Sequence, residues 1–235
     1  MKNAFFIVLF LVFCTSSYSL ENFNKINPVY DSNKIFQKIG DKIDLNLKFM
    51  NQDGQSETLK SYLGNSSVLI LTLNYYRCTT MCVYQFLNLA EILKESSAFK
   101  ENKIKVASIS FDPTDTIAVA KQTYNIWTPK TKLLNPSWNF FVGTEQNTKT
   151  LTQELNFYTE KDDEGNYSHA AALFFIRSDG TFYRYLYGIV YDKSEVSSAI
   201  YDTSLGEVGG IRDWFYELYH SYNPLRGKYI SHFNP

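Results

Sequence analysis

The run Val68–Leu73 constrains the fold of this chain more than any other segment, because it is apolar at every position except Thr72. A short run without polar alternation is typical of a strand that is buried on both faces. Such a strand needs a parallel or mixed sheet with helices on each side. From Cys82 onwards, apolar residues recur at helical spacing, at Phe86, Leu87, Leu89, Ala90 and Leu93. Residues 74–82 are therefore predicted to join a buried strand to an amphipathic helix.

The rest of the chain continues this alternation. Strands are expected at 43–49, 104–111, 138–142, 171–176 and 181–187, and helices at 115–124, 145–155, 193–202 and 210–220. A turn at Asp53-Gly54 after the first strand predicts an N-terminal hairpin. This order predicts an α/β fold, a thioredoxin-like sandwich with a central mixed sheet flanked by helices. The domain is expected at 41–203, after a lead-in segment at 20–40 and before a C-terminal helical tail at 204–235.

The first residues have the pattern of an export signal. Lys2 precedes an apolar stretch from Ala4 to Cys14, and small residues follow at Ser17 and Ser19. The stretch is too short for comfortable spanning, which takes about 20 residues. We interpret 1–19 as a cleaved signal peptide, with an uncleaved anchor or a lipidated Cys14 as alternatives. Membrane association is expected only through this segment, and export leads to a compartment where thiols need not stay reduced.

Charge and composition exclude several classes of protein. The formal net charge is -1, and no run of Lys or Arg suggests a nucleic-acid partner. Aromatic residues make up 17% of the chain, which supports a packed core and argues against disorder. Three cysteines are too few for a disulfide-stapled scaffold. Phosphate loops, dinucleotide fingerprints and His-Glu zinc-protease motifs are absent from the sequence.

Cys78 and Cys82 carry the clearest chemical signal, because they lie four residues apart at the predicted strand-to-helix junction. Helical spacing of four places both sulfurs on one face. A helix N-terminus stabilises a thiolate, and Arg77 would add a nearby positive charge. Thiolates bind metal or attack a disulfide, so the pair is a candidate for either activity. The alternative is a pair of buried structural cysteines.

The segment around the cysteines, YYRCTTMCVYQFLNLAEIL, resembles the Sco/SenC family of copper chaperones for cytochrome oxidase. So do the opening hairpin and first buried strand (40–78), the strand VASISFDPTDT, the hairpin segment YSHAAALFFIRSDGTFYRYLYGI and the tail YHSYNPLRGKY. The resemblance implies a thioredoxin-like fold that holds one copper ion, Cu(I) or Cu(II), on Cys78, Cys82 and His169. Soft thiolates suit Cu(I), and an added imidazole lets the site accept Cu(II) as well. Thr79 and Ser168 depart from the family's usual Pro and Asp.

Three functions follow as hypotheses. The first is a metallochaperone in the periplasm or on the outer face of the inner membrane. Its partner would be the copper-site subunit of a cytochrome oxidase, whose binuclear copper centre it supplies, or another copper or thiol client. The second is a thiol-disulfide oxidoreductase that uses the same cysteine pair. The third is a peroxidase-like or purely structural thioredoxin fold. Three residues separate the cysteines, whereas redox thioredoxins use two, which favours copper.

Other residues near these motifs have two interpretations. Asp112 either supports the site or a partner contact, or simply ends a strand before Pro113. Met81 offers a thioether, but methionine more often fills space in a core, so it is not included among the ligands. His220 and His232 are interpreted as structural or surface histidines.

Overall fold

The computed structural model describes residues 38–78, 80–131, 137–206, 220–223 and 228–231. A seven-stranded sheet runs through it in the order β2-β1-β5-β4-β3-β8-β9. Strands β3, β4 and β5 are parallel, and the other pairings in this sheet are antiparallel. The strand bounds are β1 Lys48–Asn51, β2 Ser56–Thr58, β3 Val68–Asn74, β4 Ile104–Ser110, β5 Trp138–Gly143, β8 Ala172–Arg177 and β9 Phe182–Tyr187. The predicted mixed sheet and the N-terminal hairpin are confirmed.

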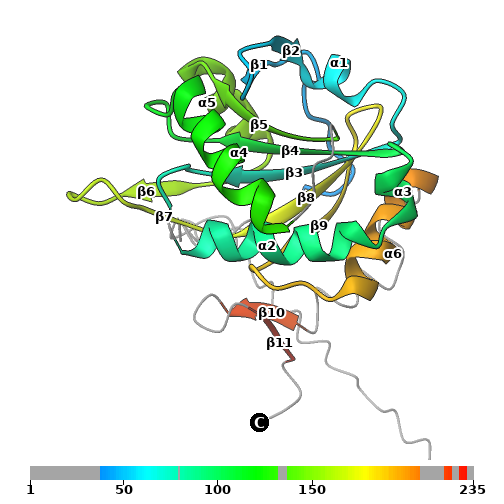
Figure 1. The fold of residues 1–235 in the computed structure, drawn as a ribbon. Coiled ribbons are helices and arrows are strands. Elements are labelled where there is room, and N and C mark those ends of the chain that lie inside the picture. Colours follow the sequence, from blue (N-terminus) through cyan, green and yellow to red (C-terminus); the bar gives the residue numbers. More distant parts are fainter. Residues whose placement is uncertain (1–37, 79, 132–136, 207–219, 224–227, 232–235) are drawn as a thin grey trace, which may run out of the picture. The chain divides into compact units, whose positions relative to one another are not determined.

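Helices cover both faces of the sheet, as the buried run in β3 requires. The helices are α1 Leu59–Leu63, α2 Met81–Lys94, α3 Ser97–Lys100, α4 Ile117–Thr131, α5 Glu145–Glu154 and α6 Lys193–Leu205. Val68 and Ile70 pack into a core with α2, α3, α4 and α6, whereas Leu69 and Leu71 pack on the opposite face with α1 and α5. Figure 1 shows α2 and α4 running across one face of the sheet. Alternate residues of one strand therefore supply two separate cores, which is why the run is apolar throughout.

The first strand begins later than the sequence predicts. Ile43, Leu45 and Leu47 are buried and alternate with exposed residues, yet only Lys48–Asn51 forms a ladder. The Leu47 N–H donates to the Asp44 carbonyl, and the Asp44 carboxylate accepts from the Asn46 N–H at 2.8 Å. The expected strand at 43–49 is therefore wrong for residues 43–47. A local turn and single backbone bonds to distant segments pair them, while the same side chains stay buried.

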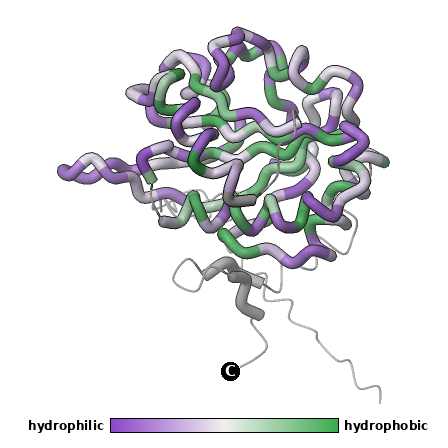
Figure 2. The backbone as a smooth tube through the Cα atoms, viewed as in Figure 1, coloured by the Kyte–Doolittle hydropathy of each residue, from purple (hydrophilic) through white to green (hydrophobic). Residues whose placement is uncertain are grey.

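The sequence pattern did not predict the hairpin of β6 (Thr159–Lys161) and β7 (Tyr167–His169). Its side chains are mostly hydrophilic, as the colouring of the projecting hairpin in Figure 2 shows. Exposed charged residues lack the alternation by which strands are recognised. His169 is the last residue of β7, so it lies on this separate two-stranded sheet. The hairpin β8–β9 follows it in the sequence.

The ends of the chain bear on three expectations. The signal peptide and lead-in segment lie outside the described residues, apart from 38–40. The expected helix at 210–220 also lies outside them, except for its last residue. In the expected tail, 204–205 complete α6, whereas 220–223 and 228–231 form the antiparallel strands β10 (His220–Asn223) and β11 (Lys228–Ser231) instead of helix. Among the described residues, no helix is both long and apolar enough to span a bilayer.

The sheet topology places the cysteine motif beside the end of a second strand. Asn74 ends β3 and lies in register with Ser110, which ends β4. The Phe111 N–H donates to the Asn74 carbonyl at 2.8 Å, so the two strand exits leave the sheet together. Side chains just past the carboxyl ends of neighbouring parallel strands are brought into contact in this way.

Candidate functional site

Cys78 lies at the start of α2 and takes the place of a capping residue there. Its N–H donates to the Tyr75 carbonyl at 3.1 Å, which closes a tight turn after β3. Thr80 is the N-cap of α2 but makes no side-chain capping bond. The Cys82 N–H donates to the Cys78 sulfur at 3.5 Å instead. The first turn of a helix leaves N–H groups unpaired, so an anionic sulfur is favoured at this point.

The pKa values of the two thiols are shifted in opposite directions. Both are free, and only 9% of Cys78 and 2% of Cys82 are exposed. A hydrogen bond from the Cys82 thiol lowers the pKa of Cys78 to about 5. Burial opposes this, whereas the N–H groups of Cys82 and Thr80 and the Tyr75 hydroxyl add to it. The same thiol pairing, together with burial, raises the pKa of Cys82. At neutral pH the pair is therefore one thiolate and one thiol, close enough to share a proton.

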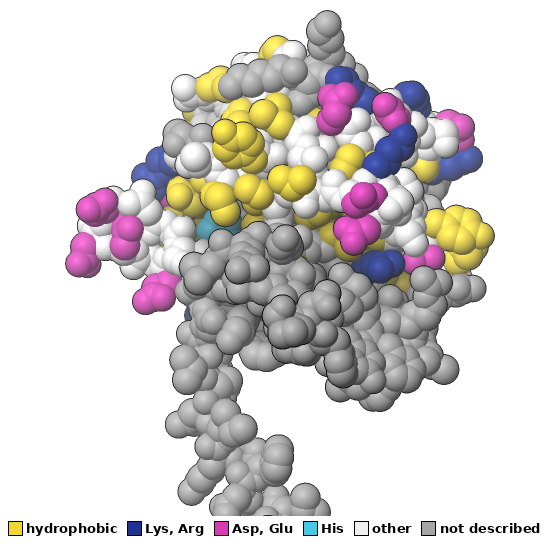
Figure 3. Space-filling view, turned by 90° about the horizontal axis from the view of Figure 1, so that it is seen from below, with side chains coloured by type: hydrophobic (Ala, Val, Ile, Leu, Met, Phe, Trp, Pro, Cys, Tyr) yellow, Lys and Arg dark blue, Asp and Glu magenta, His cyan; other side chains and the backbone are white. Residues whose placement is uncertain are grey.

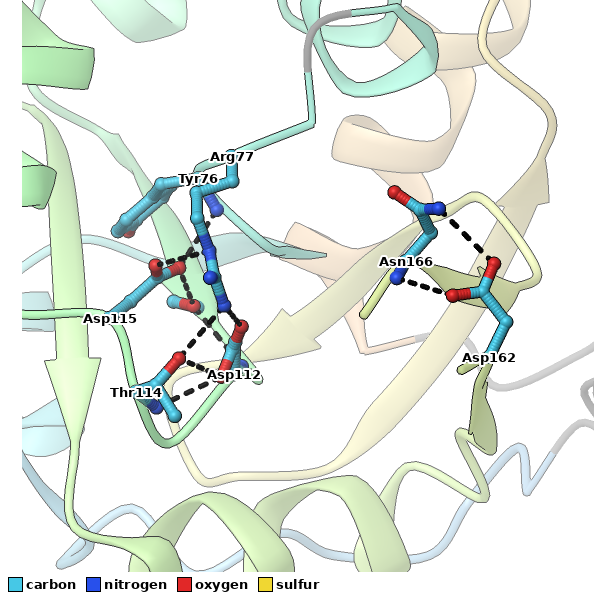
Figure 4. A network of polar contacts seen from close by, with 8 residues as sticks. Tyr76, Arg77, Asp112, Thr114, Asp115, Asp162 and Asn166 are labelled. Atoms are coloured by element: carbon cyan, nitrogen blue, oxygen red, sulfur yellow. Dashed lines mark hydrogen bonds and ion pairs between the residues drawn. The ribbon is translucent and has the colours of Figure 1, made fainter. Parts of the chain in front are cut away.

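Arg77 does not supply the positive charge that its position beside Cys78 suggests. Its guanidinium pairs with the buried carboxylate of Asp112 and donates to the Thr114 hydroxyl at 2.8 Å (Figure 4). Burial opposes the charge of Asp112, but hydrogen bonds from Thr114 and Arg77 outweigh it and lower the pKa of that carboxyl. Asp112 thus anchors the cysteine loop through Arg77. Because its side chain is fully buried, it is not a surface for direct partner contact.

Asp115 ties the same loop to the end of β4. One of its carboxylate oxygens accepts from the Tyr76 N–H at 2.8 Å and from the Ser110 hydroxyl at 2.6 Å. The other lies 3.9 Å from Nε of Arg77, and the Asp115 side chain is only 1% exposed. Asp115 begins the helix expected at 115–124, but α4 starts at Ile117, and the Asp115 carboxylate is a buried link between the two strand exits.

A buried polar layer lies behind Cys82. The Asn74 amide accepts from the Thr72 hydroxyl at 2.8 Å and donates to Gln85 at 3.2 Å. The Gln85 amide donates to the Tyr191 hydroxyl at 2.7 Å. These bonds hold α2 against β3 and the loop after β9, and Asn74 also hydrogen-bonds Cys82. Buried polar groups that are mutually satisfied fix one arrangement of the backbone, so the sulfur of Cys82 has a defined position.

His169 is held by aromatic rings and kept neutral. Its ring lies 4.9 Å from that of Phe111, 5.6 Å from that of Phe157 and 6.0 Å from that of Tyr75, measured between centroids. Burial lowers its pKa, against the opposing effects of the Ala170 carbonyl and the Cys78 sulfur. Nδ1 lies 2.9 Å from the Ala170 carbonyl, which accepts only. Nδ1 therefore carries the proton, and Nε2 has the lone pair that a metal ligand needs.

The structure brings the two sulfurs together, and Tyr75 contacts both Cys78 and His169. Tyr75 hydrogen-bonds Cys78 and stacks edge-on to His169. In the described part of the chain, no group of three or more His, Cys, Asp or Glu side chains is gathered tightly enough to hold a metal ion. Two soft sulfurs and a neutral imidazole are nevertheless the donors that copper prefers. The donor chemistry fits copper, and binding would require His169 and the cysteine pair to approach each other.

Sequence reasoning missed Tyr75, Asn74 and Gln85 as parts of this site. Asn74 is the polar residue that ends an apolar run, and Gln85 lies on the buried side of α2, so both carried a weak signal. Tyr75 carried none, because an aromatic residue after a buried strand is usually core.

Comparisons with known proteins agree on one family. The family model described as SCO1/SenC matches residues 37–203. No curated protein sequence matches the chain. Among solved structures, yeast Sco1 with copper bound is 18% identical over 76% of this chain and 98% of its own, with a TM-score of 0.56. A SCO1/SenC family lipoprotein of Bacillus anthracis str. Ames is 19% identical over 73% of this chain and 98% of its own, with a TM-score of 0.58.

A third structure is that of BsSco, a member of the Sco family of cytochrome c oxidase assembly proteins in which a disulfide switch was identified. It is 19% identical over 73% of this chain and 98% of its own, with a TM-score of 0.58. At this level of identity the solved structures establish the thioredoxin-like fold of the chain.

Proposed function

This chain belongs to the SCO1/SenC family, and on that basis we propose that it is a copper metallochaperone. Copper is its cargo, bound by Cys78, Cys82 and His169 and delivered to the binuclear copper centre of a respiratory cytochrome oxidase. Yeast Sco1 is solved with copper bound, and BsSco belongs to the cytochrome c oxidase assembly proteins. The observation that carries the proposal is the Cys78 thiolate at the start of α2, beside a second thiol and a neutral histidine.

The chemistry of the donors supports a carrier role. Thiolate sulfurs bind Cu(I) strongly, and an imidazole extends the site to Cu(II). Because the Cys78 pKa is about 5, this ligand is already deprotonated at neutral pH, so binding there releases a proton only from Cys82. Tyr75, Asn74 and the Arg77–Asp112 pair orient the two sulfurs without contributing a ligand of their own.

Copper analysis of the full chain tests this proposal. We expect one copper per chain after loading with Cu(I) and gel filtration, and loss of that copper in Cys78→Ser and in Cys82→Ser. Cys14→Ser is the matched control and should keep its copper, because Cys14 lies outside residues 37–203, which the family model matches. Full copper retention in the Cys78→Ser/Cys82→Ser double variant would exclude the chaperone function.

A second function, thiol-disulfide exchange, is favoured by the lowered pKa of Cys78. Its thiolate would attack a client disulfide and release one client thiolate. Cys82 would then attack the mixed disulfide, which releases the second client thiol and leaves a Cys78–Cys82 disulfide. Two electrons pass to the client. BsSco, with its disulfide switch, is a precedent within the family.

The pH dependence of alkylation tests the thiolate on which both functions depend. Cys78 of the reduced, copper-free chain should react with iodoacetamide at a constant rate well above pH 5, and the rate should fall as the pH drops through about 5. In Cys82→Ser the main hydrogen bond to the sulfur is altered, so the midpoint should rise toward the ordinary value of about 8.5. A wild-type midpoint already near that value would contradict the assignment.

We also propose export to the periplasm or the outer face of the inner membrane. The support is the pattern of residues 1–19, and the relative from Bacillus anthracis is a lipoprotein. Intact mass of the protein recovered from a periplasmic extract distinguishes the possibilities. A chain beginning near Leu20 supports cleavage, whereas a lipid-modified chain beginning at Cys14 supports the lipoprotein.

A further inference from the structure

Met81 is exposed, although it lies between two buried cysteines in the sequence. Met81 is 54% exposed, whereas Cys78 and Cys82 are 9% and 2% exposed. Methionine usually fills space within a core. Its exposure here excludes that role for Met81. A single exposed apolar residue is ordinary on its own, so its position relative to the sulfurs decides whether it has a function.

The peptide group that joins Met81 to Cys82 contacts the sulfur of Cys78. The nitrogen of that peptide lies 3.5 Å from Sγ of Cys78. Because Cα of Met81 is two bonds from this nitrogen, it lies no more than about 6 Å from the sulfur. The side chain of Met81 is flexible, and this short distance leaves Cys78 within the range that its thioether can sample. Cys82 is the next residue along α2.

A copper ion bound by the two cysteine sulfurs alone has room for a third, soft ligand. The described His, Cys, Asp and Glu side chains do not gather into a three-donor group, and the ring of His169 packs edge-on against that of Tyr75. An ion that arrives at the cysteine pair therefore meets two largely buried sulfurs first. A thioether is a soft ligand that selects Cu(I). It is neutral and has no proton to release, so it can bind and let go of the ion without a change in protonation.

The surroundings of Met81 favour ligand exchange with another molecule. The first turn of α2 has no acidic residue that would compete for a cation. Tyr84, one turn further along α2, is 60% exposed, so this side of the helix end is open. Figure 3 shows hydrophobic side chains next to a small exposed patch of histidine, near the acidic residues of the projecting β6–β7 hairpin.

We propose that Met81 is a transient copper(I) ligand, an exposed thioether through which the ion enters and leaves the Cys78–Cys82 pair. This inference rests on the proposed copper function. In the exchange, a bond from the Met81 sulfur to Cu(I) forms as a bond to the donor molecule breaks. The Met81 bond is then replaced by bonds to the cysteine sulfurs, and the proton of the Cys82 thiol passes to solvent. The ion stays Cu(I) throughout, so no electron is transferred.

The rate of copper transfer tests this assignment. Copper(I) is transferred between the full chain and the colorimetric chelator bicinchoninate, and the rate is compared with the equilibrium distribution. Met81→Leu keeps the size and apolar character of the side chain but removes the thioether. We expect transfer to slow about tenfold, which corresponds to a barrier higher by about 1.4 kcal/mol, with the equilibrium distribution unchanged. Met50→Leu is the matched control: Met50 is 41% exposed on β1 and should have no effect.

A direct readout is available because the chain has only three methionines. With methionine labelled with ¹³C at its methyl group, substoichiometric Cu(I) should shift or broaden the Met81 signal and leave that of Met50 unchanged. A transfer rate in Met81→Leu equal to that of wild type would overturn the proposal. So would a loss of equilibrium affinity as large as that in Cys78→Ser, because Met81 would then be a resident ligand. Failure of the wild-type chain to bind Cu(I) would overturn the proposed function itself and is seen before any variant is compared.

Discussion

Replacement of Asp115 by alanine is expected to destabilise the folded chain by about 2–6 kcal/mol, since it leaves two buried donors without an acceptor and each costs about 1–3 kcal/mol. The donors are the Tyr76 N–H and the Ser110 hydroxyl, both bonded to the same carboxylate oxygen. Tyr76 lies two residues before Cys78, so the cysteine loop should loosen as well. Denaturant unfolding, with the copper affinity measured in parallel, checks both effects.

Two further variants make the Asp115 result specific. Asp115→Asn keeps one acceptor oxygen and should lose much less stability than the alanine variant. Asp163→Ala removes an exposed carboxylate in the turn between β6 and β7 and should change stability by no more than about 0.5 kcal/mol. If Asp115→Ala unfolds at the wild-type denaturant concentration, the carboxylate does not hold the two strand exits together.

Replacement of His169 by alanine is expected to abolish the thiolate-to-copper(II) absorption band of the wild-type site, while Cu(I) stays on the two cysteines. The reason is that imidazole makes the site suitable for Cu(II), whereas two thiolates suffice for Cu(I). Because His169 also packs against Phe111, Phe157 and Tyr75, the alanine variant leaves a gap among these rings.

His169→Phe separates ligation from packing. The phenyl ring preserves the aromatic contacts but has no lone pair for the metal. We expect the band to be absent from this variant as well, as measured by visible absorption of the Cu(II)-loaded chain. A wild-type band in His169→Phe would mean that His169 has a packing role only.

The order of strands and helices was readable from the sequence because burial imposes short-range patterns. Val68–Leu73 is apolar on both sides since two cores meet on β3. Residues 43–47 show the limit of this reasoning. Their alternation reflects burial, and burial does not require a ladder when a turn and single bonds to other segments pair the backbone. The β6–β7 hairpin is mostly exposed, so no hydrophobic period marked it.

The sequence supplied the candidate residues of the site but not their connections. The cysteines are candidates from their spacing, and His169 from the family resemblance. The role of Arg77 was wrong, because proximity along the chain suggested a charge beside Cys78. Its carboxylate partner lies 35 residues away, on the exit of a neighbouring strand. Such pairings follow from the sheet register of Asn74 and Ser110, which a single sequence does not show.

The central claim is that copper is bound by two cysteine sulfurs and one histidine nitrogen, and X-ray absorption spectroscopy of the copper-loaded chain measures this directly. The account predicts two sulfur ligands and one nitrogen ligand in the wild type, loss of the nitrogen in His169→Phe, and loss of the sulfur shell in Cys78→Ser/Cys82→Ser. A copper shell made only of nitrogen and oxygen, unchanged in the double cysteine variant, would contradict it.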